Sequence, residues 1–215
     1  MRSYGQFCGL ARALDLIGDR WSMLIIRDLF SGPLRFGDLR AGLPGIPTNI
    51  LTNRLHHLID GGVVTRDADP GTGRAVVRYR LTDHGAELTG PLSALGLWGA
   101  STMTTPYEGE VVTDRSLAAA LLAAHTGRRH RQRIFQVEVA DATAHARTVG
   151  TSVEVGAGPT ADPDLVVTGD GLRELLAHTL SPARALRDKR IQITGPRALL
   201  DEFTEAFHVP LAGSN

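Results

Sequence analysis

The segment that most constrains this fold is residues 46–81, which we interpret as a helix followed by a hairpin. The first part of it, 48–60, has the sequence TNILTNRLHHLID. Four aliphatic residues recur there at helical spacing, which predicts an amphipathic helix with one buried stripe. They are Leu51, Leu55, Leu58 and Ile59. Pro47 suits the first turn of this helix because its missing N–H would have no partner there, and Gly61-Gly62 supplies a left-handed exit.

A hairpin with a Gly- and Pro-containing tip is expected directly after that helix. The runs 63–66 and 75–81 flank the sequence DADPGTG, whose Asp, Pro and Gly residues are turn formers. Along the second run, Ala75, Val77, Tyr79 and Leu81 alternate with Val76, Arg78 and Arg80. Because successive side chains of a strand point to opposite faces, one face is largely apolar and the other is cationic. The arginines of this arm are Arg74, Arg78 and Arg80.

The side of the helix opposite the aliphatic stripe carries small amides and hydroxyls. The major groove of DNA admits one helix, Asn can bond two edge atoms of adenine, and a cationic hairpin can grip neighbouring phosphates. The segment is therefore predicted to be a winged helix that reads duplex DNA. Its expected DNA contacts are Arg35, Thr48, Asn49, Thr52, Asn53, Arg54, Arg74, Arg78 and Arg80. The alternatives are a solvated polar face for the helix, and ion pairs with Asp67 or Asp69 for the hairpin arginines.

The composition is that of an ordinary globular protein with no general attraction to polyanions. The chain has 215 residues, enough for one large domain or two small ones, and its formal net charge is zero, so a DNA-binding patch would have to be local. A single cysteine, Cys8, excludes an intramolecular disulfide and fits a reducing compartment. No signal peptide or membrane-spanning run is apparent, so a cytoplasmic protein without a membrane partner is expected.

The first half of the chain reads as helices on either side of the hairpin. Helical spacing of apolar residues predicts the leading helices at 7–17, 21–30 and 35–43. The pair 35–41 and 48–60 then forms a helix-turn-helix, with the second member as the reader. After the hairpin, Thr82 can cap a further helix, which is expected to kink at Gly90-Pro91. The apolar stripe of that helix is formed by Leu88, Leu92, Leu95 and Met103.

The run that begins CGLARALDLIGDRW and continues through VRYRLTDHGAEL and LGLWGA closely resembles HxlR-type transcriptional regulators, winged-helix relatives of the MarR group. The resemblance covers residues 7–103 and is carried by three elements in the same order, IG-x-RW, GPLRF-x-(D/E)LR and L-x-x-RL-x-x-L-x-x-(D/G)G-(V/L)-V. It implies a dimer built from the first helix and the helix after the wing, whose reading helices enter half-sites about 34–36 Å apart. The family often has a positively charged residue where this chain has Asn49, so no operator sequence is carried over.

The second half reads as a separate domain after a linker at 104–111. Helices are expected at 114–125, 171–180, 181–188 and 196–207, and strands at 131–139, 143–149, 151–155, 164–170 and 190–194. Over residues 112–208 this order resembles the sterol-carrier-protein type 2 family, on the segments DLVVTGDGLRELL and L-x-P-x-x-AL-x-DKRI-x-I-x-G. The resemblance implies an apolar tunnel for water-insoluble molecules. Its candidate lining residues, which can equally be plain core, are Phe135, Val137, Phe203 and Phe207.

Few other residues suggest chemistry. Cys8 is a candidate redox sensor, because some HxlR-type relatives sense oxidants through a cysteine near the N-terminus and a helix start favours a thiolate. The alternative is a buried, inert cysteine. The pairs His56-His57 and His125/His130 lack Cys or carboxylate partners at ligand spacing, so no metal or other cofactor is expected. No Ser/His/Asp signature, phosphate loop or paired-carboxylate motif is present, so an enzyme is not expected.

These observations predict an α+β protein in three parts: a winged helix at 1–103, a linker at 104–111, and a sterol-carrier-like domain with an antiparallel sheet at 112–215. The expected function is that of a homodimeric, sequence-specific repressor whose binding to double-stranded operator DNA responds to a hydrophobic small molecule in the second domain. Two alternatives remain. One is a thiol-based regulator that senses through Cys8, and the other is a lipid-carrier or accessory module without specific DNA binding.

Overall fold

The computed structural model describes residues 3–69, 76–103 and 107–211. The chain divides into two compact units, Met1–Leu92 and Ser93–Asn215, and each is described by itself. The division falls within helix α6 (Thr89–Thr102), whereas the sequence predicted a linker after that helix, at 104–111.

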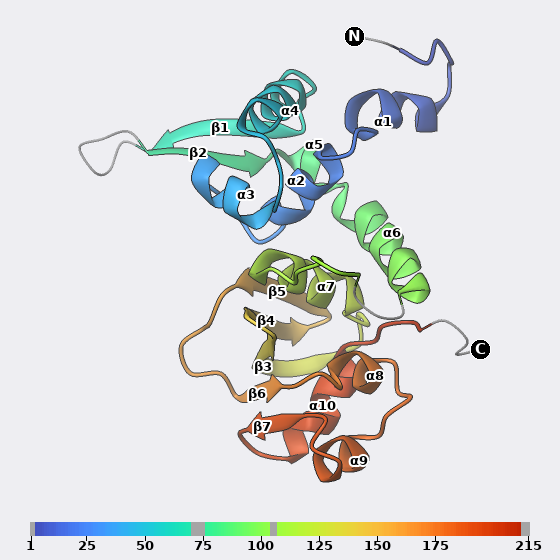
Figure 1. Ribbon diagram of the computed structural model, residues 1–215, viewed down its shortest axis with the longest axis vertical. Helices are drawn as coiled ribbons and strands as arrows, with labels where there is room; N and C mark the ends of the chain where they lie inside the picture. Colours follow the sequence, from blue (N-terminus) through green and yellow to red (C-terminus); the bar gives the residue numbers. More distant parts are fainter. Residues whose placement is uncertain (1–2, 70–75, 104–106, 212–215) are drawn as a thin grey trace. The chain divides into compact units, whose positions relative to one another are not determined.

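The first unit contains the helices and the hairpin expected from the sequence (Figure 1). Its elements before α6 are α1 (Gly9–Ile17), α2 (Ser22–Leu29), α3 (Phe36–Gly42), α4 (Thr48–Asp60), β1 (Val64–Asp69), β2 (Val76–Leu81) and α5 (Asp83–Ala86). Aliphatic residues from all the helices up to α4 and from the start of β1 form one buried core. The β1–β2 hairpin projects away from these helices as a two-stranded arm.

Helix α4 forms because its aliphatic stripe is buried on one side. Leu51, Leu55 and Leu58 are buried, whereas Ile59 is half-buried, so the predicted stripe is confirmed. Pro47 precedes the helix with an extended backbone, as a residue just outside a helix does. Of the two exit glycines, only Gly62 has a left-handed backbone, with φ of 71°. The bounds of α4 agree with the predicted ones.

The hairpin is antiparallel and pairs Val64 with Leu81 at its base and Asp69 with Val76 at its described end. The first strand is longer than the predicted 63–66, since it continues to Asp69. Leu34, between α2 and α3, joins the edge of β2 through two hydrogen bonds with Tyr79, at N···O distances of 2.9 and 2.7 Å. This bridge fixes the hairpin to the helix-turn-helix.

The region after the hairpin differs from its prediction. Thr82 does cap a helix, because its Oγ1 accepts a hydrogen bond from the Gly85 N–H at 3.0 Å. That helix is α5, however, and it ends at Ala86, before α6 begins at Thr89. The kink predicted at Gly90-Pro91 is therefore wrong. Pro91 lies in the first turn of α6, where its missing N–H removes no helical hydrogen bond.

The second unit is a five-stranded sheet with helices (Figure 1). Its elements after α6 are α7 (Asp114–Ala124), β3 (His130–Val139), β4 (Ala142–Gly150), β5 (Ser152–Ala157), β6 (Leu165–Thr168), α8 (Leu172–Leu176), α9 (Pro182–Arg187), β7 (Gln192–Thr194) and α10 (Ala198–Ala206). All nine were expected, and their first and last residues differ from the predicted ones by a few positions.

The sheet has the strand order β5-β4-β3-β6-β7. The pairing of β3 with β6 is parallel and the other three pairings are antiparallel, so the sheet is mixed, and the prediction of an antiparallel sheet is wrong for this one pairing. After the β3-β4-β5 meander the chain returns across the sheet to the free edge of β3. The Thr160 N–H in this returning loop donates to Oε1 of Gln136 on β3, at 3.0 Å.

One face of the sheet carries the core of the second unit. Helix α7 packs on β4 and β5, and α10 packs on β3. Alternate positions of β4 are the small residues Ala142, Ala144 and Ala146, all buried, which lets α7 approach the sheet closely. The result is an α+β unit whose helices and sheet share one apolar layer.

Candidate nucleic-acid interface

The polar side of α4 is free on the molecular surface. Thr48, Asn49, Asn53 and His56 are exposed. Thr52 is half-buried, and its hydroxyl donates to the Thr48 carbonyl oxygen at 3.0 Å, as a threonine inside a helix often does. Within the described ranges, no hydrogen bond engages the side-chain amide of Asn49 or Asn53. Each amide can therefore offer its donor and its acceptor to another molecule.

The helix-turn-helix holds α4 in this position. Helix α3 and the following turn bury Leu39, Leu43 and Ile46 in the same core as the leucines of α4. Arg35 stands at the start of α3 with an exposed side chain, while its backbone N–H donates to Oδ2 of Asp38 at 3.1 Å. The predicted helix-turn-helix is thus present.

The arginines of the hairpin are not equivalent. Nε of Arg80 lies 2.5 Å from Oδ2 of Asp67, which is one of the two ion pairs that the sequence allowed. Arg78 lies directly opposite Asp67 in the strand register and is half-buried. Arg74 lies outside the described residues. Arg66 on β1 is exposed, and sequence reasoning missed it because the first strand was expected to end there.

Arg54, the remaining cation predicted to contact DNA, is also paired. Its Nε lies 3.3 Å from Oδ1 of Asp19, and the two side chains are 35 % and 22 % exposed. Asp19 precedes α2 in the chain and was not among the predicted site residues. No signal in the sequence separated Arg54 from its neighbours, because the pairing depends on how α4 lies beside the α1–α2 corner.

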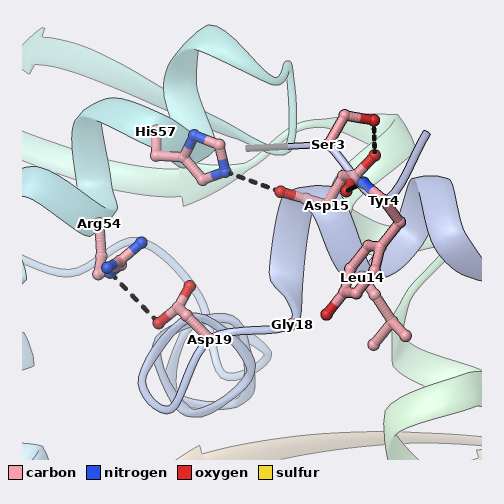
Figure 2. A pocket seen from close by; sticks show the side chains of 8 residues that line it. All are labelled: Ser3, Tyr4, Leu14, Asp15, Gly18, Asp19, Arg54 and His57. Carbon is pink, nitrogen blue, oxygen red and sulfur yellow. Dashed lines mark hydrogen bonds and ion pairs between the residues drawn. The ribbon is translucent and has the colours of Figure 1, made fainter. Parts of the chain in front are cut away.

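A hollow lies beside α4 at this corner (Figure 2). Its volume is about 360 Å³, and its walls are Ser3, Tyr4, Leu14, Asp15, Gly18, Asp19, Arg54 and His57. The carboxylate of Asp15 accepts from the Ser3 hydroxyl at 2.9 Å and from the Tyr4 N–H at 3.0 Å, which fixes the N-terminal segment along α1. Nε2 of His57 lies 3.4 Å from the Asp15 carbonyl oxygen, so that nitrogen carries the proton.

The helices α1 and α6 expose apolar side chains. Phe7 and Leu10 are exposed at the start of α1, and Tyr4 is exposed just before it. Helix α6 has no buried residue, and Leu95 and Trp98 on it are exposed. Cys8 is exposed as well, directly before α1, so the alternative of a buried cysteine is wrong.

The four residues predicted to line a tunnel contact one another instead of an open space. Phe135, Val137, Phe203 and Phe207 are all essentially inaccessible to solvent. The ring centroids of the three phenylalanines lie 5.2 to 6.0 Å apart, which is ordinary packing of aromatic rings. At this point the space between the sheet and α10 is filled by these side chains.

His125 and His130 of the second unit lie close together, with no third metal ligand beside them among the described residues. The ring centroids of His125 and His130 lie 6.3 Å apart. Burial, and the positive charge that His130 can carry, lower the pKa of His125 below 6.5. In the part of the chain that the structure describes, no group of three or more His, Cys, Asp and Glu side chains could hold a metal ion. No helix of the described residues is long and apolar enough to cross a membrane.

Comparison with known proteins places the first unit in a family. The HxlR-like helix-turn-helix family matches residues 16–107. A transcriptional regulator of the helix-turn-helix type from Synechocystis is 38 % identical over 96 residues, covering 45 % of this chain and 70 % of that protein. A similar regulator from Mycobacterium bovis is 38 % identical over 100 residues, and there the match spans only 60 % of the relative's length. The solved structure of the redox regulator HypR in its oxidised form is 28 % identical, covers 46 % of this chain and all of HypR, and superposes with a TM-score of 0.43. With a winged helix-turn-helix in its first unit and these sequence matches, this chain belongs to the HxlR-like helix-turn-helix family.

Proposed function

We propose that this protein is a sequence-specific, DNA-binding transcriptional repressor that reads its operator with α4. The observation that carries the proposal is the free polar face of that helix: Asn49 and Asn53 are exposed, while three leucines hold the opposite face in the core. The amide N–H of an Asn side chain can donate to N7 of adenine, and its amide oxygen can accept from the adenine N6 amine, so it pairs in two places with an adenine edge in the major groove. The family membership supports the same reading.

Phosphate contacts come from the cations beside that face. Arg35 is exposed at the start of α3, and Arg78 is half-buried on the hairpin with no ion pair to its guanidinium among the described residues. Arg74 belongs to the same predicted set. Arg80 would have to exchange Asp67 for a phosphate, which makes it a weaker contributor.

The DNA-bound form is a homodimer built on the first helix and the helix after the wing. Each of these helices carries an exposed large apolar residue that a second copy would bury, Leu10 on α1 and Trp98 on α6, and the exposed Phe7 lies just before α1. Burying one such side chain contributes about 1.5–3 kcal/mol. A pair of reading helices would then occupy half-sites about 34–36 Å apart, one helical turn of DNA.

The second unit binds a hydrophobic effector between its sheet and its helices, in the manner of sterol-carrier proteins. The aromatic rings of Phe135, Phe203 and Phe207 fill that layer, so an effector has to displace them or enter beside them. A coupling free energy of about 1–3 kcal/mol between the two sites is enough to change operator occupancy substantially.

The test begins with duplexes selected from a random library by the purified protein. The proposal expects a recurring, two-fold symmetric sequence, bound at least about a thousandfold more tightly than random duplex. Replacement of Asn49 by Ala should remove the preference at one base pair per half-site. Equal affinity for all duplexes would instead support the carrier or accessory module. If no apolar compound shifts the affinity, the effector part of the proposal fails.

A second candidate function is thiol-based sensing, favoured by the exposure of Cys8 at the start of α1. An exposed thiol has access to oxidants. Because the chain has one cysteine, the reversible oxidised product would be a disulfide between two subunits or with a small thiol. Cys8→Ser separates the candidates: an oxidant response of DNA binding that survives this substitution removes the thiol from the mechanism.

A further inference from the structure

The contact between Arg54 and Asp19 joins the reading helix to the corner between α1 and α2 (Figure 2). The two side chains are only 35 % and 22 % exposed, so water and salt screen this pair less than a pair on the open surface. Arg54 also lies on a different side of α4 from Asn49 and Asn53, because a helix turns by about 100° per residue. Its Nε is buried and lies toward Asp19.

Contacts other than the one with Arg54 hold the carboxylate of Asp19 in place. Its Oδ1 accepts hydrogen bonds from the backbone N–H groups of Trp21, at 2.9 Å, and Ser22, at 3.1 Å. Its Oδ2 accepts a hydrogen bond from the Ser22 hydroxyl. These donors stand at the start of α2, where N–H groups have no helical partner. A carboxylate held by three donors loses little further freedom when it pairs with an arginine.

Two more contacts follow Arg54 along the same side of α4. His57, three residues on, donates from Nε2 to the Asp15 carbonyl oxygen of α1. Gly61, seven residues on, leaves room for Leu16 of α1, whose Cδ1 would stand 2.2 Å from a Cβ at that position. Residues at these spacings share one side of a helix. The end of α1 and the turn after it therefore support the second half of α4.

We infer that Arg54 is a positioning residue for DNA binding, which acts through Asp19 to hold the reading helix against the α1–α2 corner and does not contact a phosphate. This inference rests on the proposed function, since it assigns a role within the same DNA interface. The same contact connects α1 with the reading helix. A subunit contact through the exposed apolar residues of α1 could therefore affect the position of the reading helix.

Salt dependence separates the two roles of Arg54. A phosphate contact releases counterions, so its loss lowers the slope of log K against log salt concentration by about 0.9. A positioning contact has no counterion to release, so its loss lowers the affinity at every salt concentration and leaves the slope unchanged. The same loss must then appear when Asp19 is changed, although Asp19 cannot bind a phosphate.

The experiment measures binding of the full chain to its selected operator between 50 and 200 mM salt, for Arg54→Gln, Asp19→Asn and the double variant. Asp19→Asn keeps an acceptor for the Trp21 and Ser22 N–H groups and removes the charge. We expect each single variant to bind about threefold to thirtyfold more weakly with an unchanged slope. The double variant should bind no more weakly than the single ones, because both remove one contact. Arg35→Gln is the matched control, and its slope should fall by about 0.9.

The inference is overturned if Arg54→Gln reduces the slope by about 0.9 while Asp19→Asn binds like the wild type. It is also overturned if the losses of the two single variants add in the double variant. Circular dichroism of Arg54→Gln, which leaves the α2 start intact, shows that the lost affinity does not come from unfolding. Failure of the proposed function looks different, because the wild-type chain itself would then show no preference for any duplex.

Discussion

The polar face of α4 was predicted to bind DNA, and the phenylalanine cluster of the second unit was predicted to bind an apolar molecule. The first is exposed in the structure and the second is buried. Asn49 and Asn53 are exposed with unused hydrogen-bonding groups. Phe135, Phe203 and Phe207 are closed against one another with essentially no exposed surface. An exposed amide gains nothing from its own protein, whereas a buried ring already has its partners. The first surface is ready for a ligand, and the second must be opened first.

The largest expected effect tests the closed side of this comparison. Phe203→Ala should lower the free energy of unfolding by about 3–5 kcal/mol, because it leaves a cavity among rings that are fully packed. Calorimetric or denaturant unfolding measures the loss. Phe7→Ala is the matched control, since that ring is exposed and its truncation should leave the stability of the monomer unchanged. A loss below about 1 kcal/mol for Phe203→Ala would mean that the layer is open enough to collapse or to hold an effector as it stands.

The next effect tests the open side. Asn49→Ala should weaken binding to the selected operator by about 1–3 kcal/mol, with no change in stability, because the amide has no partner within the described protein. Asn is neutral, so the salt dependence of binding should be unaltered. Gln132→Ala, at an exposed amide of the second unit, should leave affinity intact. Unchanged affinity of Asn49→Ala would show that this face is merely solvated.

A smaller effect concerns the pH dependence of the closed side. The pKa of His125 is lower in the folded chain than 6.5, its usual value, because of burial and of His130. As the pH falls below 6.5, the unfolded chain takes up the proton first, so the free energy of unfolding should fall until folded His125 also protonates. Unfolding at pH 7.5 and 5.5 should show this decrease, and His125→Gln should reduce it. His56→Gln, at an exposed ring, is the control. An identical pH dependence in His125→Gln would contradict the assignment.

The smallest expected effect concerns the ion pair between Arg80 and Asp67 on the hairpin. The Arg80–Asp67 pair is about half exposed on both sides, 50 % and 49 %, so Arg80→Gln should cost less than about 1 kcal/mol of stability. Asp67→Asn frees Arg80 for a phosphate and should raise DNA affinity at low salt while steepening the salt dependence. Titrations of operator at two salt concentrations measure this. If neither the affinity nor its salt dependence changes, Arg80 does not contact the DNA backbone.

Much of this molecule could be read from periodicity. The leucines of α4 recur at helical spacing and are buried, and the alternating residues of β2 form the strand that they predict. Thr82 caps a helix as its type suggests. The kink at Gly90-Pro91 failed because Pro91 suits the first turn of a new helix equally well, and one sequence position cannot tell these apart. The prediction of an antiparallel sheet failed for a related reason, since the parallel direction of β6 beside β3 is not encoded in the residues of either strand.

What the sequence determined by itself is the set of local elements and the family, because spacing of apolar residues and turn formers acts over a few residues at a time. Which side chains remain free was decided only by the tertiary structure. Arg54 and Arg80 look like their unpaired neighbours in the sequence, yet Asp19 and Asp67 engage them. Charges far apart along the chain meet only when helices and strands pack. The same packing closed the three phenylalanines into a core, and it left the amides of α4 in water.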